Sequence, residues 1–208
     1  MKRFSPVIAA CLAVSLVFAG CADNKESKPI ITDSSPAVIT IPTQNLEHQD
    51  DEKCEDAFRE LFNSIYAPNC GDSFFKYMYP DAAIEKMKST GEYASLVSTY
   101  NSNQSEFIAM MKATPKITEF TSVTPLTESQ IAAAKRYLVN LSKDILPDLR
   151  PDDLVITEGF EVKCNIIDYN EREDTDTECM VKLEGDGWKA VTFSAEGLEQ
   201  NFPETPTE

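Results

Sequence analysis

The chain has 208 residues, 26% of them charged, and a formal net charge of −16 at pH 7. Such an acidic surface repels phosphate backbones, so we expect no nucleic-acid partner. The only histidine, His48, precedes the segment that we expect to fold, so that segment offers no histidine for Ser-His-Asp or Cys-His catalysis or for a metal site.

The N-terminal residues have the order of a secretory signal peptide. Lys2 and Arg3 form a short positive region, and residues 7–18 follow as an uncharged, mostly apolar stretch. This stretch is too short for a membrane-spanning helix, which needs about 20 residues. No later segment is apolar enough to span a membrane, so the sequence predicts a secreted protein without a transmembrane helix.

Residues 18–21 (Phe-Ala-Gly-Cys) resemble the lipobox of bacterial lipoproteins, although Phe18 stands where leucine is usual. The resemblance implies removal of residues 1–20 as a lipoprotein signal peptide, and acyl chains such as palmitate on Cys21. Two or more acyl chains anchor a protein stably. The expected location is the extracytoplasmic face of the cell membrane, with the membrane as a partner through the lipid. The alternative is an ordinary signal peptide with an incidental cysteine.

Beyond the signal, the chain divides into a tether, one domain and a tail. Residues 21–50 are polar, contain proline and lack long periodicity, which predicts a flexible tether behind lipidated Cys21. Residues 51–196 are numerous enough for a single hydrophobic core. Residues 197–208 are acidic and rich in proline, and we expect a disordered tail there.

Apolar periodicity and helix-ending prolines predict the elements of the domain. In chain order they are helices from residue 54 to Pro68, over 72–79 and over 93–111, a strand over 116–124, a helix opened by a capping box at Thr127, and strands over 155–169, 178–183 and 188–193. Helices followed by an antiparallel meander make an α+β domain.

This order, with the ending Gly-Asp-Gly-Trp-Lys over 185–189, resembles the NTF2-like, or cystatin-like, domain. Tyr79-Pro80 followed by Gly91-Glu92-Tyr93 also resembles uncharacterised bacterial lipoproteins thought to carry such domains. The resemblance covers residues 54–194 and rests on topology. It implies N-terminal helices packed on a curved antiparallel sheet, but it leaves the activity open, because the family includes isomerases, dehydratases, transport factors and add-on modules.

Four cysteines lie in the expected domain, and an even number in an exported chain favours disulfide bonds. We expect Cys164 to pair with Cys179, because that register also sets apolar residues against each other on one face of the hairpin. The facing pairs would be Cys164–Cys179, Val162–Val181 and Phe160–Leu183. Cys54–Cys70 follows by elimination, and it requires early fraying of the first helix.

Three patterns are weak candidates for chemistry. Ser73 and Lys76 match S-x-x-K, but the other two motifs of that class of serine enzyme are missing from the sequence. The acidic run over 168–178 could offer oxygen ligands to Ca²⁺, yet it lacks the glycine of an EF-hand loop, so a solvated turn is the better interpretation. Asp168 would act as a base only at the mouth of an apolar pocket. We therefore assign no catalytic, cofactor-binding or metal-binding residue.

The expected function is that of a lipid-anchored, non-enzymatic binding or interaction module for an unknown protein or small-molecule ligand. The alternative is a small pocket enzyme of isomerase or dehydratase type that uses a carboxylate base. The interior of the sheet distinguishes the two functions. A core filled by Phe107, Tyr100 and Trp188 favours the module, and an open cavity lined by Asp168 and tyrosines favours the enzyme.

Overall fold

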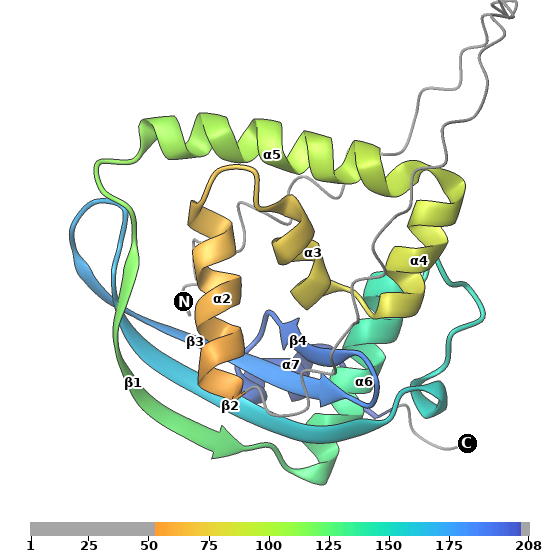
Figure 1. Ribbon diagram of the computed structural model, residues 1–208. Helices are drawn as coiled ribbons and strands as arrows, with labels where there is room; N and C mark the ends of the chain where they lie inside the picture. The colour runs from red at the N-terminus through yellow and green to blue at the C-terminus, as the bar shows by residue number, and fades with distance from the viewer. Residues whose placement is uncertain (1–52, 205–208) are drawn as a thin grey trace, which may run out of the picture. The chain divides into compact units, whose positions relative to one another are not determined.

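Helices come first and an antiparallel meander follows in the computed structural model, which describes residues 53–204 (Figure 1). The signal peptide, Cys21 and the predicted tether lie outside these residues. No helix within 53–204 has the length and apolar character needed to cross a membrane. The helices are α2 (Cys54–Tyr66), α3 (Gly71–Met78), α4 (Asp81–Thr90), α5 (Glu92–Met110), α6 (Glu128–Ser142) and α7 (Ala195–Asn201), and the strands are β1 (Lys116–Pro125), β2 (Ile156–Ile167), β3 (Glu173–Leu183) and β4 (Gly187–Val191).

The strands form one antiparallel sheet in the order β1-β2-β3-β4. The register between β1 and β2 shifts twice, between Ile117 and Glu119 and between Phe120 and Ser122. Such irregularities increase the twist of a strand, and Figure 1 shows the sheet curving beneath α2 and α3. The predicted fold class is confirmed: the domain is α+β, with N-terminal helices packed on a curved antiparallel sheet.

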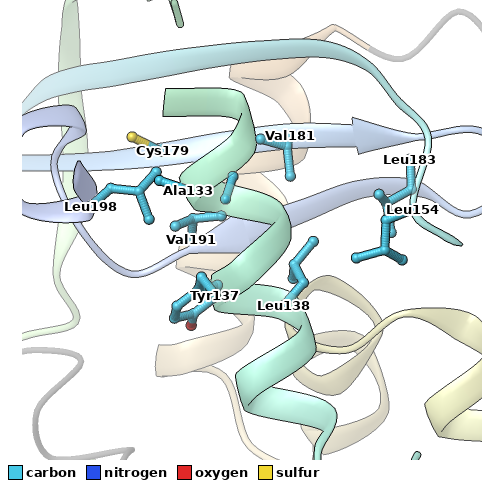
Figure 2. Close-up of a cluster of buried hydrophobic side chains, with 10 residues drawn as sticks. Ala133, Tyr137, Leu138, Leu154, Cys179, Val181, Leu183, Val191 and Leu198 are labelled. Carbon is cyan, nitrogen blue, oxygen red and sulfur yellow. The ribbon is translucent and has the colours of Figure 1, made fainter. Parts of the chain in front are cut away.

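Helices cover both faces of the sheet. On one face, the rings of Phe58 from α2 and Phe120 from β1 meet edge to face, with their centres 6.0 Å apart. On the other face, α6 packs against β3 and β4 (Figure 2). The buried residues of this second cluster are Ala133, Ala134, Tyr137, Leu138, Leu154, Cys179, Val181, Leu183, Val191 and Leu198.

The helix predicted after β1 is confirmed as α6, and its capping box is what made it predictable. Helix α4 was not expected. Thr127 accepts a hydrogen bond from the backbone N–H of Gln130, and the Gln130 side chain accepts one from the backbone of Thr127, so the capping box is present. Helix α4 begins after Pro80 and ends at Gly91, whose φ of +80° is a left-handed cap that glycine adopts without strain. Its short apolar face gives little periodic signal.

The register predicted for the β2–β3 hairpin is wrong. Cys164 lies opposite Asp176, and Cys179 lies opposite Glu161. Strand β3 begins at Glu173, several residues earlier than predicted, so residues assigned to the turn belong to the strand. Because side chains alternate along a strand, Cys179 points to the face opposite that of Asp176 and Cys164.

Neither expected disulfide forms in the structure, where all four cysteines of the described residues are free thiols. Cys164 and Cys179 project from opposite faces of the sheet. The early fraying that a Cys54–Cys70 bond requires does not occur, because α2 runs from Cys54 to Tyr66, a length of about 20 Å. A disulfide needs Cβ atoms that point towards each other, so the pairing of Cys164 with Cys179 fails on geometry.

Residues 197–201, predicted to begin a disordered tail, instead belong to helix α7. Leu198 of this helix is fully buried against α6. The guanidinium of Arg136 donates two hydrogen bonds to the carbonyl of Phe202, at 3.0 and 2.7 Å. The helix depends on the surface that α6 offers, and a short polar sequence cannot reveal such a contact.

Candidate binding groove on helix α5

The space between the curved sheet and the N-terminal helices is filled with aromatic side chains. Tyr100 and Trp188 are each 3% exposed. Tyr100 stacks on Phe74 with ring centres 4.5 Å apart, and Trp188 lies 6.1 Å from the ring of Phe160. Phe107 is only partly buried and contacts Tyr169 near the end of the hairpin. Two of the three residues expected to fill the core therefore do so.

Asp168 organises the β2–β3 turn. Its backbone N–H donates to the carbonyl of Arg172 at 2.8 Å, and its carboxylate accepts hydrogen bonds from the backbone N–H groups of Arg172 and Asn170. The bond from Arg172, followed by that from Asn170, lowers the pKa of Asp168, because both favour the charged form. A carboxylate engaged in this way is a turn residue rather than the base of an apolar pocket.

From Glu173 onward, the acidic run lies in β3. Asp176 and Glu178 are each 3% exposed and lie on the α2 face of the sheet. Burial, with a smaller contribution from the charge of Asp176, raises the pKa of Glu178 well above its usual range. No group of three or more His, Cys, Asp or Glu side chains within residues 53–204 is arranged to hold a metal ion. Asp176 and Glu178 are therefore buried strand residues and do not belong to a loop.

Ser73 and Lys76 lie on exposed positions of α3. The ammonium of Lys76 is 5.3 Å from the ring centre of Tyr77. The backbone carbonyl of Lys76 accepts a hydrogen bond from Lys189 at 2.9 Å. Neither of these contacts involves Ser73, and neither forms a recess in which a substrate could bind.

A groove of about 610 Å³ opens where the α2–α3 connection meets α5. The backbone N–H of Gly71 donates to Asn101 Oδ1 at 2.9 Å and so joins the two walls. A Cβ atom at Gly71 would lie 2.9 Å from that oxygen and 3.2 Å from the side chain of Val97, so only glycine permits this approach. The lining residues are Asn69, Asp72, Tyr93, Ala94, Val97, Ser98, Asn101, Ser102 and Ser105.

Asp72 is the only charged side chain among the residues that line this groove in the described part of the chain. Its carboxylate is hydrogen-bonded to the hydroxyl of Tyr93. Burial, and then the charge and hydrogen bond of Asp72, raise the pKa of Tyr93, so the hydroxyl stays protonated and remains a donor. Among the described residues that line the groove, Asp72 thus supplies one negative charge and none supplies a positive charge.

Uncharged hydrogen-bonding groups follow the α5 wall. Residues 93–105 contain no charged residue, whereas 26% of the whole chain is charged. Ser98 and Ser102 are exposed and lie one helical turn apart. Asn101 uses its Oδ1 for Gly71, which leaves its Nδ2 hydrogens available as donors. The wall thus presents hydroxyl and amide groups in fixed positions.

The sequence prediction missed this groove because it treated residues 93–111 as one apolar stripe facing the core. Only Tyr93, Tyr100 and Gln104 of α5 are buried, so most of the helix surface is exposed. The uncharged stretch within an acidic chain was the available signal. Comparison with protein-family models, with curated proteins and with solved structures gives no match to this chain. Function therefore has to be inferred from the groove and from the N-terminal pattern.

Proposed function

We propose that the protein is a lipid-anchored binding module on the extracytoplasmic face of a membrane, and that the groove on α5 is its ligand site. The anchor is supported by the signal-like residues 1–20 and by the lipobox-like residues that end at Cys21. The α+β unit, with a meander that curves beneath its helices, suits an NTF2-like domain. The observation that carries the binding function is the contrast between a packed interior and a preformed outer groove.

The groove is preorganised for binding. The Gly71–Asn101 hydrogen bond and the stacking of Phe74 on Tyr100 hold α3 and α5 together. Fixed walls reduce the ordering cost that a ligand must overcome. Binding sites combine a recess with a few placed polar groups, and Ser98, Asn101 and Ser102 provide such groups here.

A small pocket enzyme with a carboxylate base is the second candidate, and Glu178 is the observation that favours it. A raised pKa suits a general base that works near neutral pH. With an exposure of 3%, Glu178 could reach a substrate only if the interior opened. This requirement makes the binding module the better supported function.

Ligand-induced thermal stabilisation of the full-length protein tests the two functions. The ligands are a mixed library of peptides, metabolites and oligosaccharides. Ser102→Glu places a charge in the groove, and Asn103→Glu places the same charge on the next exposed residue, which does not line it. The module requires a ligand that raises the Tm of the wild type and of Asn103→Glu but not that of Ser102→Glu.

A ligand present at about 100 times its Kd stabilises a protein by about 2.7 kcal/mol, which is a measurable shift in Tm. The enzyme requires the opposite pattern, in which stabilisation or turnover is lost in Glu178→Gln and kept in Ser102→Glu. A library whose ligands all stabilise Ser102→Glu as well as the wild type contradicts the proposed groove.

A further inference from the structure

Charge restricts the class of ligand that the groove can accept. Among residues 53–204, no lysine or arginine lines it, and the chain carries a net charge of −16. A phosphate, sulfate or carboxylate would therefore meet an unfavourable potential without a compensating cation. A metal ion would find only the carboxylate of Asp72, which is already bonded to Tyr93. The electrostatics therefore disfavour an anionic ligand and permit an uncharged one.

The helical walls disfavour a peptide. Backbone groups inside α3 and α5 are used within the helices, so the groove offers no strand edge to which an extended peptide could add. Binding of an amphipathic helix or a proline-rich segment needs a groove lined by apolar or aromatic side chains. Here the apolar lining is limited to Ala94, Val97 and the mostly buried Tyr93. Serine is also depleted at protein interfaces.

The remaining groups match a ligand that carries many hydroxyls. Ser98, Ser102 and Ser105 follow one side of α5 at steps of four and three residues, so about one hydroxyl recurs per 5.4 Å turn. The hydroxyls of Ser98 and Ser102 can donate and accept, as a sugar hydroxyl can, and the Asn101 amide adds donors. The hydroxyl of Ser105 donates to the carbonyl of Asn101 at 2.8 Å and can still accept. We infer, on the basis of the proposed function, that the groove binds an uncharged oligosaccharide lying along α5.

Protein-observed NMR titration of the full-length protein in detergent tests this inference. The probes are unmodified oligomers of glucose and of N-acetylglucosamine, about five sugar units long, with an anionic oligogalacturonate and a serine-rich peptide of similar length for comparison. At least one neutral oligomer should shift the amide signals of α5 and of the α2–α3 connection. Ser102→Glu should weaken that binding by at least about tenfold, whereas Asn103→Glu should leave it within about twofold.

A double variant, Ser98→Ala with Ser102→Ala, adds no charge and keeps the test valid if Ser102→Glu does not fold. Losing two hydroxyl partners should weaken binding by about tenfold. The ligand class is overturned, and the binding module stands, if only the peptide or the anionic oligomer binds in a manner sensitive to Ser102→Glu. Sugar binding that ignores both groove variants overturns the assignment to this groove. If no probe class responds to them, the inference and the proposed function both fall.

Discussion

Asp176 and Glu178 lie two residues apart on β3 and point to the face of the sheet that α2 covers. The sequence interpretation placed them in a solvated turn, because a run of carboxylates is normally exposed. Their burial depends on where β3 starts, and the short turn at Asp168 fixes that start through its own backbone hydrogen bonds. The burial of these two carboxylates thus depends on the strand register, which the amino-acid composition does not encode.

Replacing Glu178 by Gln should stabilise the protein near neutral pH. The pKa of Glu178 is raised in the folded state above its ordinary value of 4.5, so the folded state binds this proton more tightly. In the wild type, this tighter binding of the proton stabilises the folded state fully below the pKa that Glu178 has when unfolded. That contribution is lost as the pH rises towards the pKa of Glu178 in the folded state. We therefore expect Glu178→Gln to raise the unfolding free energy at neutral pH.

Urea unfolding at pH values from about 4.5 upward measures this effect. The Glu178→Gln protein should show a flatter decline in unfolding free energy than the wild type. Glu173→Gln, at the exposed start of the same strand, is the matched control and should change little. Equal stabilisation by both variants would mean that the overall negative charge, rather than the burial of Glu178, sets the pH dependence.

The thiols should differ sharply in reactivity. Burial raises the pKa of Cys54 and of Cys164 to about 12, and it also raises the pKa of Cys179, whereas Cys70 is partly exposed. The thiolate is the reactive form, so iodoacetamide should label Cys70 first in the folded protein and the other three only after unfolding. Peptide mass spectrometry reads out the order. Rapid labelling of Cys179 in the native protein would contradict the packing on α6.

At the level of elements, the sequence predicted the structures that depend on interactions between residues close together in the chain. The capping box at Thr127 identifies the start of α6, because both of its hydrogen bonds lie within four residues. Helix α7 and the approach of Gly71 to α5 were not predictable, because each depends on a surface distant in sequence. The groove belongs to this second group, so the sequence could indicate its uncharged wall but not the recess.

Lys189 shows how β4 is joined to the helices. Its side chain is fully buried, and its ammonium donates to the carbonyl of Lys76 at 2.9 Å and to Asp81 Oδ1 at 2.8 Å. The Asp81 side chain is 53% exposed, so water weakens the ion pair while the bond to the carbonyl stays inside. The lysine therefore acts mainly as a buried hydrogen-bond donor that links β4 to α3 and α4.

Replacing Lys189 by Met should lower the unfolding free energy by about 1–3 kcal/mol, because the carbonyl of Lys76 loses its donor while the apolar stem is kept. Chemical unfolding measures the change. Lys88→Met is the matched control, since Lys88 forms an exposed bridge to Glu85 at 2.9 Å, and it should cost less than about 0.5 kcal/mol. A similar loss of unfolding free energy in both variants would show that the burial of the Lys189 donor does not determine the cost.

On the scale of the whole molecule, an acidic majority of the surface contrasts with a groove whose described lining carries a single charge, that of Asp72. The acidic surface keeps the protein soluble and repels anionic headgroups, so membrane attachment would depend on lipid alone. Composition predicted the acidity, and the pattern at residues 1–21 predicts the attachment. Neither identifies a ligand, because the groove forms only where the α2–α3 connection meets α5.

Cys21→Ala should move the protein from the membrane fraction to the soluble fraction of cells that express the full chain. Loss of the acylated thiol removes the proposed anchor, since two or more acyl chains are what hold such a protein stably. Immunoblots of the fractions measure the effect. Cys70→Ala removes a thiol without touching the anchor and should stay with the membrane. Retention of Cys21→Ala after a high-salt wash would show that another interaction holds the protein.

Trp188 has a practical consequence. It is the only tryptophan in the chain, and it lies between the ring of Phe160, 6.1 Å away, and the ammonium of Lys182, 5.9 Å from its ring centre. Fluorescence excited selectively in tryptophan therefore comes from one emitter on β4. Its emission should be blue-shifted in the folded protein and move to the red as the strand becomes hydrated. The molecule thus carries its own optical probe for sheet unfolding, without an added dye.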